Sequence, residues 1–151
     1  MRYSFLIATI SLIIITVVSC NKNKFTTKPQ LKYKSASRTE LKPGDVLQMK
    51  LSFTDKEGDL TPLDTLYLRQ YSINCEKTKF EDKILLPKFP NSADLEGEFL
   101  VTYGYRVLPY LKEPQCDDKP RDTCFFVFSL KDRAQNSSDT IQSEPIVLLK
   151  E

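Results

Sequence analysis

The sequence contains no histidine and no tryptophan. Without histidine the chain cannot form the Ser–His or Cys–His pairs that activate many protein nucleophiles, and it cannot supply the histidine ligands of the commonest zinc sites. The absence of histidine is the strongest single argument against familiar hydrolase chemistry. Carboxylate chemistry is the catalytic route that stays open, with Asp55 and Asp59 as the side chains that would carry it. We therefore expect that the protein is not an enzyme.

The chain also lacks an excess of charge of either sign. Its 22 lysines and arginines stand against 20 aspartates and glutamates, which gives a formal net charge of +2 over 151 residues. Proteins that bind nucleic acid usually carry a clustered basic surface, whereas the charges here are scattered along the sequence. A nucleic-acid partner is therefore not expected.

The longest apolar segment lies near the N-terminus, from Phe5 to Val18, and follows the positive charge of Arg2. It is too short for a membrane-spanning helix, which needs about 20 apolar residues, and it is typical of a secretory signal peptide. The segment ends in "VVSC", which resembles the lipobox of bacterial lipoproteins, with Val17 where that family usually has leucine. The resemblance implies that Cys20 is acylated and becomes the mature N-terminus. The alternative is an ordinary signal peptide followed by an unmodified cysteine.

This interpretation divides the chain into a signal peptide at residues 1–19, a lipidated cysteine with a flexible tether at residues 20–30, and a domain at residues 31–151. The tether, "NKNKFTTKPQ" after the cysteine, is polar and aperiodic. Each buried CH₂ group of an acyl chain contributes about 0.8 kcal/mol, so several chains anchor a protein to a membrane. Some surface lipoproteins of Bacteroidetes carry an acidic run after the cysteine. Its absence here favours the periplasmic side of the outer membrane within the cell envelope.

Cysteine pairing is the main covalent question. Lipidation of Cys20 leaves Cys75, Cys116 and Cys124, an odd number that allows one intramolecular disulfide. The compartment of an exported protein permits it. The segment "CDDKPRDTC" would close as a short loop between two strands, which favours Cys116–Cys124. A bridge from Cys75 to either partner and three free thiols are the alternatives, because geometry decides pairing.

Apolar and polar residues alternate in most of the chain after the tether, which is the pattern of half-buried β-strands. The clearest case is residues 45–53, "DVLQMKLSF". Related patterns recur at residues 65–73, 82–90, 98–108, 123–132 and 140–150, where Gly104 is expected to mark a bulge and Pro145 an edge or a bulge. The pattern predicts an all-β protein, a single immunoglobulin-like antiparallel β-sandwich of about seven strands.

Two motifs support this architecture by resemblance. "FTDKEGDL" at residues 53–60 is similar to a turn in small Bacteroidetes lipoproteins with immunoglobulin-like or cadherin-like domains, and "FSLKDRAQNSSDTI" at residues 128–141 is similar to their closing motif. Gln135 stands where that group usually has glycine, the residue that most easily takes a left-handed backbone. The resemblance covers about residues 40–150 and implies an architecture, because most members of the group have no established activity.

The acidic residues Asp55, Glu57 and Asp59 alternate in "SFTDKEGDL". An EF-hand does not fit, because apolar residues occupy the positions that require glycine and the bidentate glutamate. A turn fits, with Asp55 at its start and Gly58 at a positive φ. Calcium is the alternative cofactor, because these three carboxylates, with Asp132 from the closing motif, would supply part of an oxygen cage.

Three tyrosines and two threonines carry further alternatives. Tyr103, Tyr105 and Tyr110 either pack within the sheet, as their strand spacing favours, or form an aromatic binding surface. "DTL" and "DTI" resemble the three-residue O-glycosylation acceptor of Bacteroidetes, with Thr65 and Thr140 as the modified residues.

We predict a lipid-anchored envelope protein that contacts other envelope proteins through sheet edges or end loops. A calcium- or carbohydrate-dependent adhesion module is the alternative.

Overall fold

The computed structural model describes residues 26–75, 78–111, 116 and 118–150, and every regular element in these residues is a β-strand. The longer strands are β1 (Gln30–Ala36), β3 (Val46–Asp55), β4 (Thr65–Ser72), β5 (Lys79–Leu85), β6 (Leu95–Gly104), β7 (Arg121–Lys131) and β9 (Ile146–Leu149). β2 (Glu40–Leu41) and β8 (Ile141–Gln142) have two residues each. The expected all-β chain with about seven main strands is confirmed.

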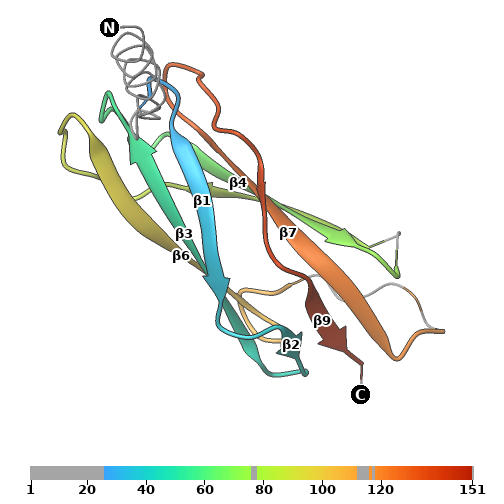
Figure 1. Cartoon of the computed structure of the whole chain (residues 1–151). Helices are drawn as coiled ribbons and strands as arrows, with labels where there is room; N and C mark the ends of the chain where they lie inside the picture. Colours follow the sequence, from blue (N-terminus) through green and yellow to red (C-terminus); the bar gives the residue numbers. More distant parts are fainter. Residues whose placement is uncertain (1–25, 76–77, 112–115, 117, 151) are drawn as a thin grey trace, which may run out of the picture.

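The strands form two sheets packed as a sandwich (Figure 1). One sheet has the order β1-β3-β6 and is antiparallel. The other has the order β2-β9-β7-β4-β5, with β8 beside β7, and β2 joins β9 in parallel. The chain crosses from one sheet to the other between β3 and β4 and returns between β5 and β6. Crossovers of this kind are common in β-sandwiches.

The alternation in the sequence decides which side chains enter the core. In β3 every second residue from Leu47 to Asp55 is buried, and in β7 every second residue from Asp122 to Leu130 is buried. The apolar members of both rows belong to one cluster between the sheets. Phe53 stacks on Phe99 there, with 4.5 Å between ring centroids. Each such side chain contributes about 1.5–3 kcal/mol by leaving water.

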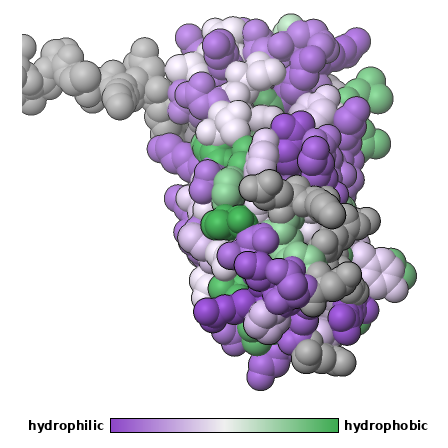
Figure 2. Space-filling model, turned by 90° about the vertical axis from the view of Figure 1, so that its right-hand side faces the viewer, coloured by the Kyte–Doolittle hydropathy of each residue, from purple (hydrophilic) through white to green (hydrophobic). Residues whose placement is uncertain are grey.

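The outer surface is mostly polar. The face in Figure 2 is largely hydrophilic, and its apolar residues form small separate patches. Among the described residues, the exposed large apolar side chains include Leu85 on β5 and Leu100 on β6, which line one groove. Such a local concentration on a polar surface marks a candidate interaction site.

Two segments differ from the expectation. β6 ends at Gly104, which stands opposite Val46 without a bulge. Glycine is needed there because a Cβ would overlap the backbone of Val107. The strand expected at residues 140–150 is two short strands, β8 and β9, with Pro145 immediately before β9. Proline has no N–H to donate to a ladder, so it occupies the break.

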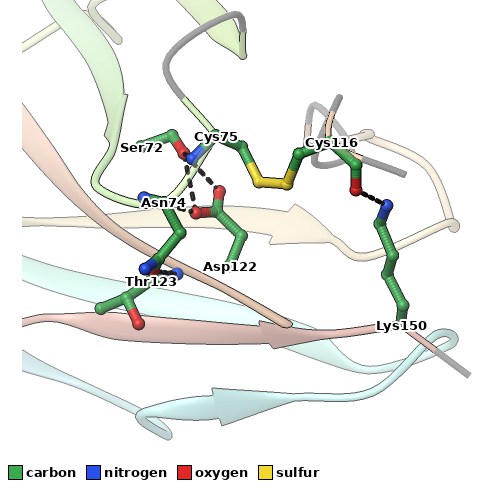
Figure 3. Close-up of a disulfide and its surroundings, with 7 residues drawn as sticks. All are labelled: Ser72, Asn74, Cys75, Cys116, Asp122, Thr123 and Lys150. Carbon is green, nitrogen blue, oxygen red and sulfur yellow. Dashed lines mark hydrogen bonds between the residues drawn. A yellow bond between two sulfur atoms is a disulfide. The ribbon is translucent and has the colours of Figure 1, made fainter. Parts of the chain in front are cut away.

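The disulfide joins Cys75 to Cys116, with 5.4 Å between their Cα atoms, so the favoured Cys116–Cys124 pairing is wrong (Figure 3). Cys124 lies in β7 with no exposed surface and belongs to the core cluster. Alternation along β7 turns its side chain inward, away from the loop that carries Cys116. Burial raises the pKa of the Cys124 thiol to about 12, and the nearby Asp122 charge adds to this effect. The thiol therefore stays protonated and unreactive.

A polar network holds the chain beside this disulfide (Figure 3). The Ser72 hydroxyl donates to the buried Asp122 carboxylate at 2.7 Å, and the backbone N–H of Cys75 donates to the Ser72 oxygen at 2.8 Å. The Lys150 ammonium donates to the carbonyl oxygen of Cys116. These bonds fasten the end of β4 to β7 and the Cys116 segment to the C-terminal strand.

The described part of the chain contains no helix long and apolar enough to cross a membrane. The predicted signal peptide, Cys20 and the first part of the tether lie outside the described residues. The domain begins slightly before residue 31, because Pro29 is buried and Gln30 already pairs with Thr54 in the sheet.

Candidate binding sites

"DKEGDL" forms the turn that follows β3. Asp55 is the last residue of the strand, and its Oδ2 accepts a hydrogen bond from the backbone N–H of Asp59 at 3.1 Å. Gly58 has a φ of +64°, and a Cβ there would overlap the carbonyl group of Ser92. Both the left-handed backbone and the available space therefore require glycine. The expectation of a turn is confirmed.

The closing motif also forms a turn. Gln135 has a φ of +69°, so the backbone is left-handed here although the residue is not the glycine of the motif that it resembles. The Asp132 carboxylate accepts hydrogen bonds from the backbone N–H of Asn136 at 2.7 Å and from its Nδ2 at 2.9 Å. These bonds stabilise the turn, which is a common use of Asp and Asn side chains.

Three of the four candidate calcium ligands lie near one another. Asp55 has no exposed surface, Asp132 is almost fully buried and Asp59 is half-buried, whereas Glu57 is exposed. The charges of Asp59 and Asp132 both act on the Asp55 carboxyl. Asp132 is already occupied by Asn136. Within the described ranges, no three or more Cys, Asp or Glu side chains form a group that could hold a metal ion.

The hydrogen-bonding capacity of the Asp55 carboxylate is nevertheless not fully used. Its Oδ1 and the Oδ1 of Asp59 are buried without a hydrogen-bond partner. Burial raises the pKa of the Asp55 carboxyl, and the charge of Asp59 raises it further, while the hydrogen bond from the Asp59 backbone lowers it. A buried carboxylate oxygen without a donor favours either a proton or a cation at that position. The raised pKa means that the folded protein favours a proton on the Asp55 carboxyl. The clustered carboxylates of the motif make calcium the alternative.

We expect Asp55→Asn to stabilise the protein at neutral pH by about 1 kcal/mol, or about 4 °C in Tm. The amide keeps the acceptor for the Asp59 N–H and removes the buried charge. Because the carboxyl pKa is higher in the folded state than in the unfolded state, protonation stabilises the wild type. That contribution is complete below the unfolded pKa of about 4 and is lost as the pH rises through the folded value. The difference in Tm should therefore shrink towards pH 4.

Thermal unfolding followed by circular dichroism in EDTA and in millimolar calcium separates the proton from the cation. We expect equal Tm values for the wild type in both buffers. A calcium-dependent rise that Asp55→Asn removes would contradict this and would identify a calcium site. Glu57→Gln is the matched control, because this neighbouring carboxylate is exposed and outside the group.

Sheet edges are the second candidate, because they present backbone groups that can pair with another strand. The edges here are β1 and β6 of one sheet and β2 and β5 of the other. β1 has exposed lysines at 32 and 34 and a register break after Tyr33, and β5 has exposed charges at 79, 81 and 83. The exposed charges and the register break both oppose pairing with another strand. β6 carries glutamates at 96 and 98 but no charge from Phe99 to Gly104.

The hydrogen bonds of Gly104 show which way the β6 backbone points. Its N–H donates to the carbonyl of Pro109 at 2.6 Å, and its own carbonyl accepts from the N–H of Leu111 at 2.9 Å. Both groups therefore point away from β3. In an antiparallel ladder this direction repeats at every second residue.

Gln48 of β3 supports the same alternation. It donates its N–H to the Ser37 hydroxyl at 3.0 Å and accepts from the Ser37 N–H at 2.8 Å, on the side away from β6. Thr102, its partner in register, therefore points its own N–H and C=O to the free edge, as do Leu100 and Glu98 at steps of two. Outside the strand ladders, no backbone–backbone hydrogen bond among the described residues involves these three.

An apolar groove of about 400 Å³ lies between the edges of β5 and β6. Its lining includes Leu85 and Leu100, which are 66% and 59% exposed. The Tyr103 hydroxyl donates to the Asp82 carboxylate within this lining and so ties the two edges together. Asp82 and Glu98 are the charged members of the lining. The groove is thus apolar with an acidic contribution.

The other candidate residues are dispersed. Tyr103 and Tyr105 are 4% and 0% exposed, so they pack in the sandwich and form no aromatic surface with the exposed Tyr110. Thr65 is half-buried in β4, and Thr140 is exposed beside a cleft on the outer face of β4. Whether either threonine carries a sugar stays a prediction. The β6 edge was missed as a specific site, because no local pattern in the sequence indicates which strands end a sheet.

No family model and no curated protein matches the sequence. Among solved structures the chain is similar to Spo0M, a sporulation control protein from Bacillus subtilis, with a TM-score of 0.44 and 11% identity over 83% of this chain and 51% of that one. The chain spans about half the length of that protein. A likeness this distant says nothing about function.

Proposed function

We propose that the protein is a lipid-anchored component of the cell envelope that binds an extended segment of another envelope protein at the free edge of β6. The observation that carries the proposal is the row of backbone groups at Glu98, Leu100 and Thr102 beside an apolar groove. Strand addition uses such groups for affinity and side-chain pockets for selectivity. This function is non-catalytic.

The N-terminal sequence supports the location. "VVSC" at residues 17–20 would place the acyl chains on Cys20, on the periplasmic side of the outer membrane. The residues between Cys20 and β1 span roughly 30 Å when extended. The domain would therefore stay close to the membrane while it reaches partners in the adjoining space.

The groove specifies the chemistry of the partner segment. Every second side chain of a strand added to β6 would point towards the groove, where Leu85 and Leu100 favour apolar residues. Asp82 and Glu98 would favour a lysine or arginine in the same segment. We therefore expect an alternating apolar segment that carries basic residues.

Hydrogen–deuterium exchange of the full lipidated chain tests the proposal and does not require that the partner be identified. The segment 98–103 is measured in native envelope vesicles and again after purification in detergent. Occupation of the edge should slow exchange in the vesicles by about tenfold at the amides that face the edge. The β1 edge at residues 30–36 is the internal control. Equal exchange rates of segment 98–103 in both preparations would contradict the proposal.

Leu100→Pro should abolish this protection. The substitution removes an N–H that points to the free edge and leaves the bonds of β6 to β3 in place, so Tm should change by no more than about 4 °C, or about 1 kcal/mol. Leu100→Thr is the matched control, because it keeps the N–H at an exposed strand position. Protection that survives Leu100→Pro would show that the slow exchange has another origin.

Calcium-dependent adhesion is the second candidate function. It is supported by the two partnerless carboxylate oxygens of Asp55 and Asp59, and the comparison of Asp55→Asn with the wild type in calcium decides it.

A further inference from the structure

The outer face of β5, β4 and β7 combines aromatic rings with positive charge. The strand registers place three rows across this face: Lys83, Tyr67 and Ser129; Glu81, Arg69 and Val127; Lys79, Tyr71 and Phe125. The intervening residues of β4, such as Leu66 and Leu68, are buried. By alternation, the side chains of the three rows therefore point outward.

The charge on this face is unbalanced. Outward-facing Lys79, Lys83, Lys131 and Arg69 stand against Glu81 on this face. The Asp82 carboxylate also lines the cleft there, but it accepts a hydrogen bond from the Tyr103 hydroxyl. Arg69 is paired with Glu81 at 2.7 Å. The ion pairs found among the described residues leave the three lysines out. The face is therefore a local concentration of cations that attracts an anionic ligand.

A cleft of about 700 Å³ lies on this face and is lined by Tyr67, Tyr71, Lys83, Ser129 and Thr140, among others. Lys83 Nζ lies 5.8 Å from the centroid of the Tyr67 ring. Four residues along β4 separate Tyr67 from Tyr71, or about 13 Å. The cleft thus offers an aromatic ring beside an ammonium group, with hydroxyls nearby.

The two tyrosines are not equivalent. The Tyr71 ring stacks on Phe125 at 5.3 Å with 16° between planes, and its hydroxyl accepts a hydrogen bond from Arg69 at 3.0 Å. The ring and the hydroxyl of Tyr71 therefore both already have contacts within the protein. Tyr67 has the flexible Lys83 over its ring, a contact that a ligand can replace. A single available ring does not provide the series of stacking platforms that a single-stranded nucleic acid uses.

We infer that this face binds a carboxylated oligosaccharide, with a uronic acid ring on Tyr67. The apolar C–H face of the sugar would pack on the ring, and its carboxylate would meet the Lys83 ammonium. The Ser129 and Thr140 hydroxyls would bind sugar hydroxyls. The site is separate from the β6 edge, so it adds a ligand to the proposed function and does not depend on it.

Isothermal titration of the full lipidated protein in detergent micelles tests this inference. The probes are hexagalacturonate, hexamannuronate, methyl-esterified hexagalacturonate and a ten-residue oligothymidylate. We expect at least one of the free hexauronates to bind with a Kd below about 1 mM. That binding should weaken with added salt, and the ester should bind about tenfold more weakly than the free acid.

Variants separate this site from general charge attraction. Tyr67→Ala and Lys83→Gln should each weaken hexauronate binding by about tenfold, while Tyr67→Phe should retain it. Lys32→Gln on β1 is the matched control for lost charge, and Leu100→Pro should bind as the wild type does. The inference is overturned if neither hexauronate binds, if Lys32→Gln weakens binding as much as Lys83→Gln, or if the oligothymidylate binds more tightly through the same residues.

Discussion

Removing the Cys75–Cys116 disulfide should lower the Tm by about 10–15 °C. The bridge joins residues 41 positions apart, and closing a loop of this length restricts the unfolded chain by about 4 kcal/mol. For a domain of this size, that free energy corresponds to the stated shift. The measurement is thermal unfolding of Cys75→Ser and Cys116→Ser variants beside the wild type, all without reductant.

Cys124→Ala is the matched control for this prediction. It removes a buried thiol from the core and should cost about 1 kcal/mol, the effect of a small cavity. Mass spectrometry of unreduced peptides should find Cys75 linked to Cys116. A Cys116–Cys124 linkage, with a Tm that does not respond to Cys75→Ser, would contradict the structure.

Gly58→Ala should destabilise the protein by about 3 kcal/mol, which lowers the Tm by about 10 °C. Alanine at a φ of +64° costs about 1–2 kcal/mol in backbone strain. The new Cβ would also overlap the carbonyl group of Ser92, so the turn after β3 would have to separate from the segment before β6. Chemical denaturation at neutral pH measures the loss directly.

Gly44→Ala provides the comparison for Gly58→Ala. Gly44 also has a positive φ, at +96°, but nothing lies within 4 Å of a Cβ built there. Its substitution reports backbone strain alone, at about 1–2 kcal/mol. Equal losses at the two positions would mean that contact with Ser92 contributes nothing to the turn.

Much of the architecture was predictable from local patterns. The alternation of Leu47, Met49, Leu51 and Phe53 identified a half-buried strand, and each of these side chains is buried in β3. The same rule placed Tyr103 and Tyr105 in the core. It worked because successive side chains of a strand point to opposite faces, so burial follows from the sequence once the period is two.

The site was less predictable. Asp55 at the start of a turn and Gly58 at a positive φ followed from turn chemistry. That the Asp55 carboxyl would be fully buried with one oxygen partnerless did not follow, because its neighbour Asp132 comes from a distant part of the chain. At Gln135 the sequence left the backbone conformation open, and the structure shows it to be left-handed.

Residue types and their period were enough to establish the all-β class, the buried face of each main strand and the turn at "DKEGDL". These properties depend on neighbours within a few residues. Only the tertiary structure decided that Cys75 meets Cys116, that β6 has a free edge, and that Tyr67 and Lys83 share a cleft. Each of these depends on which strands become neighbours. Sheet order is set by the joint burial of all the apolar faces, to which every strand contributes, so no local pattern contains it.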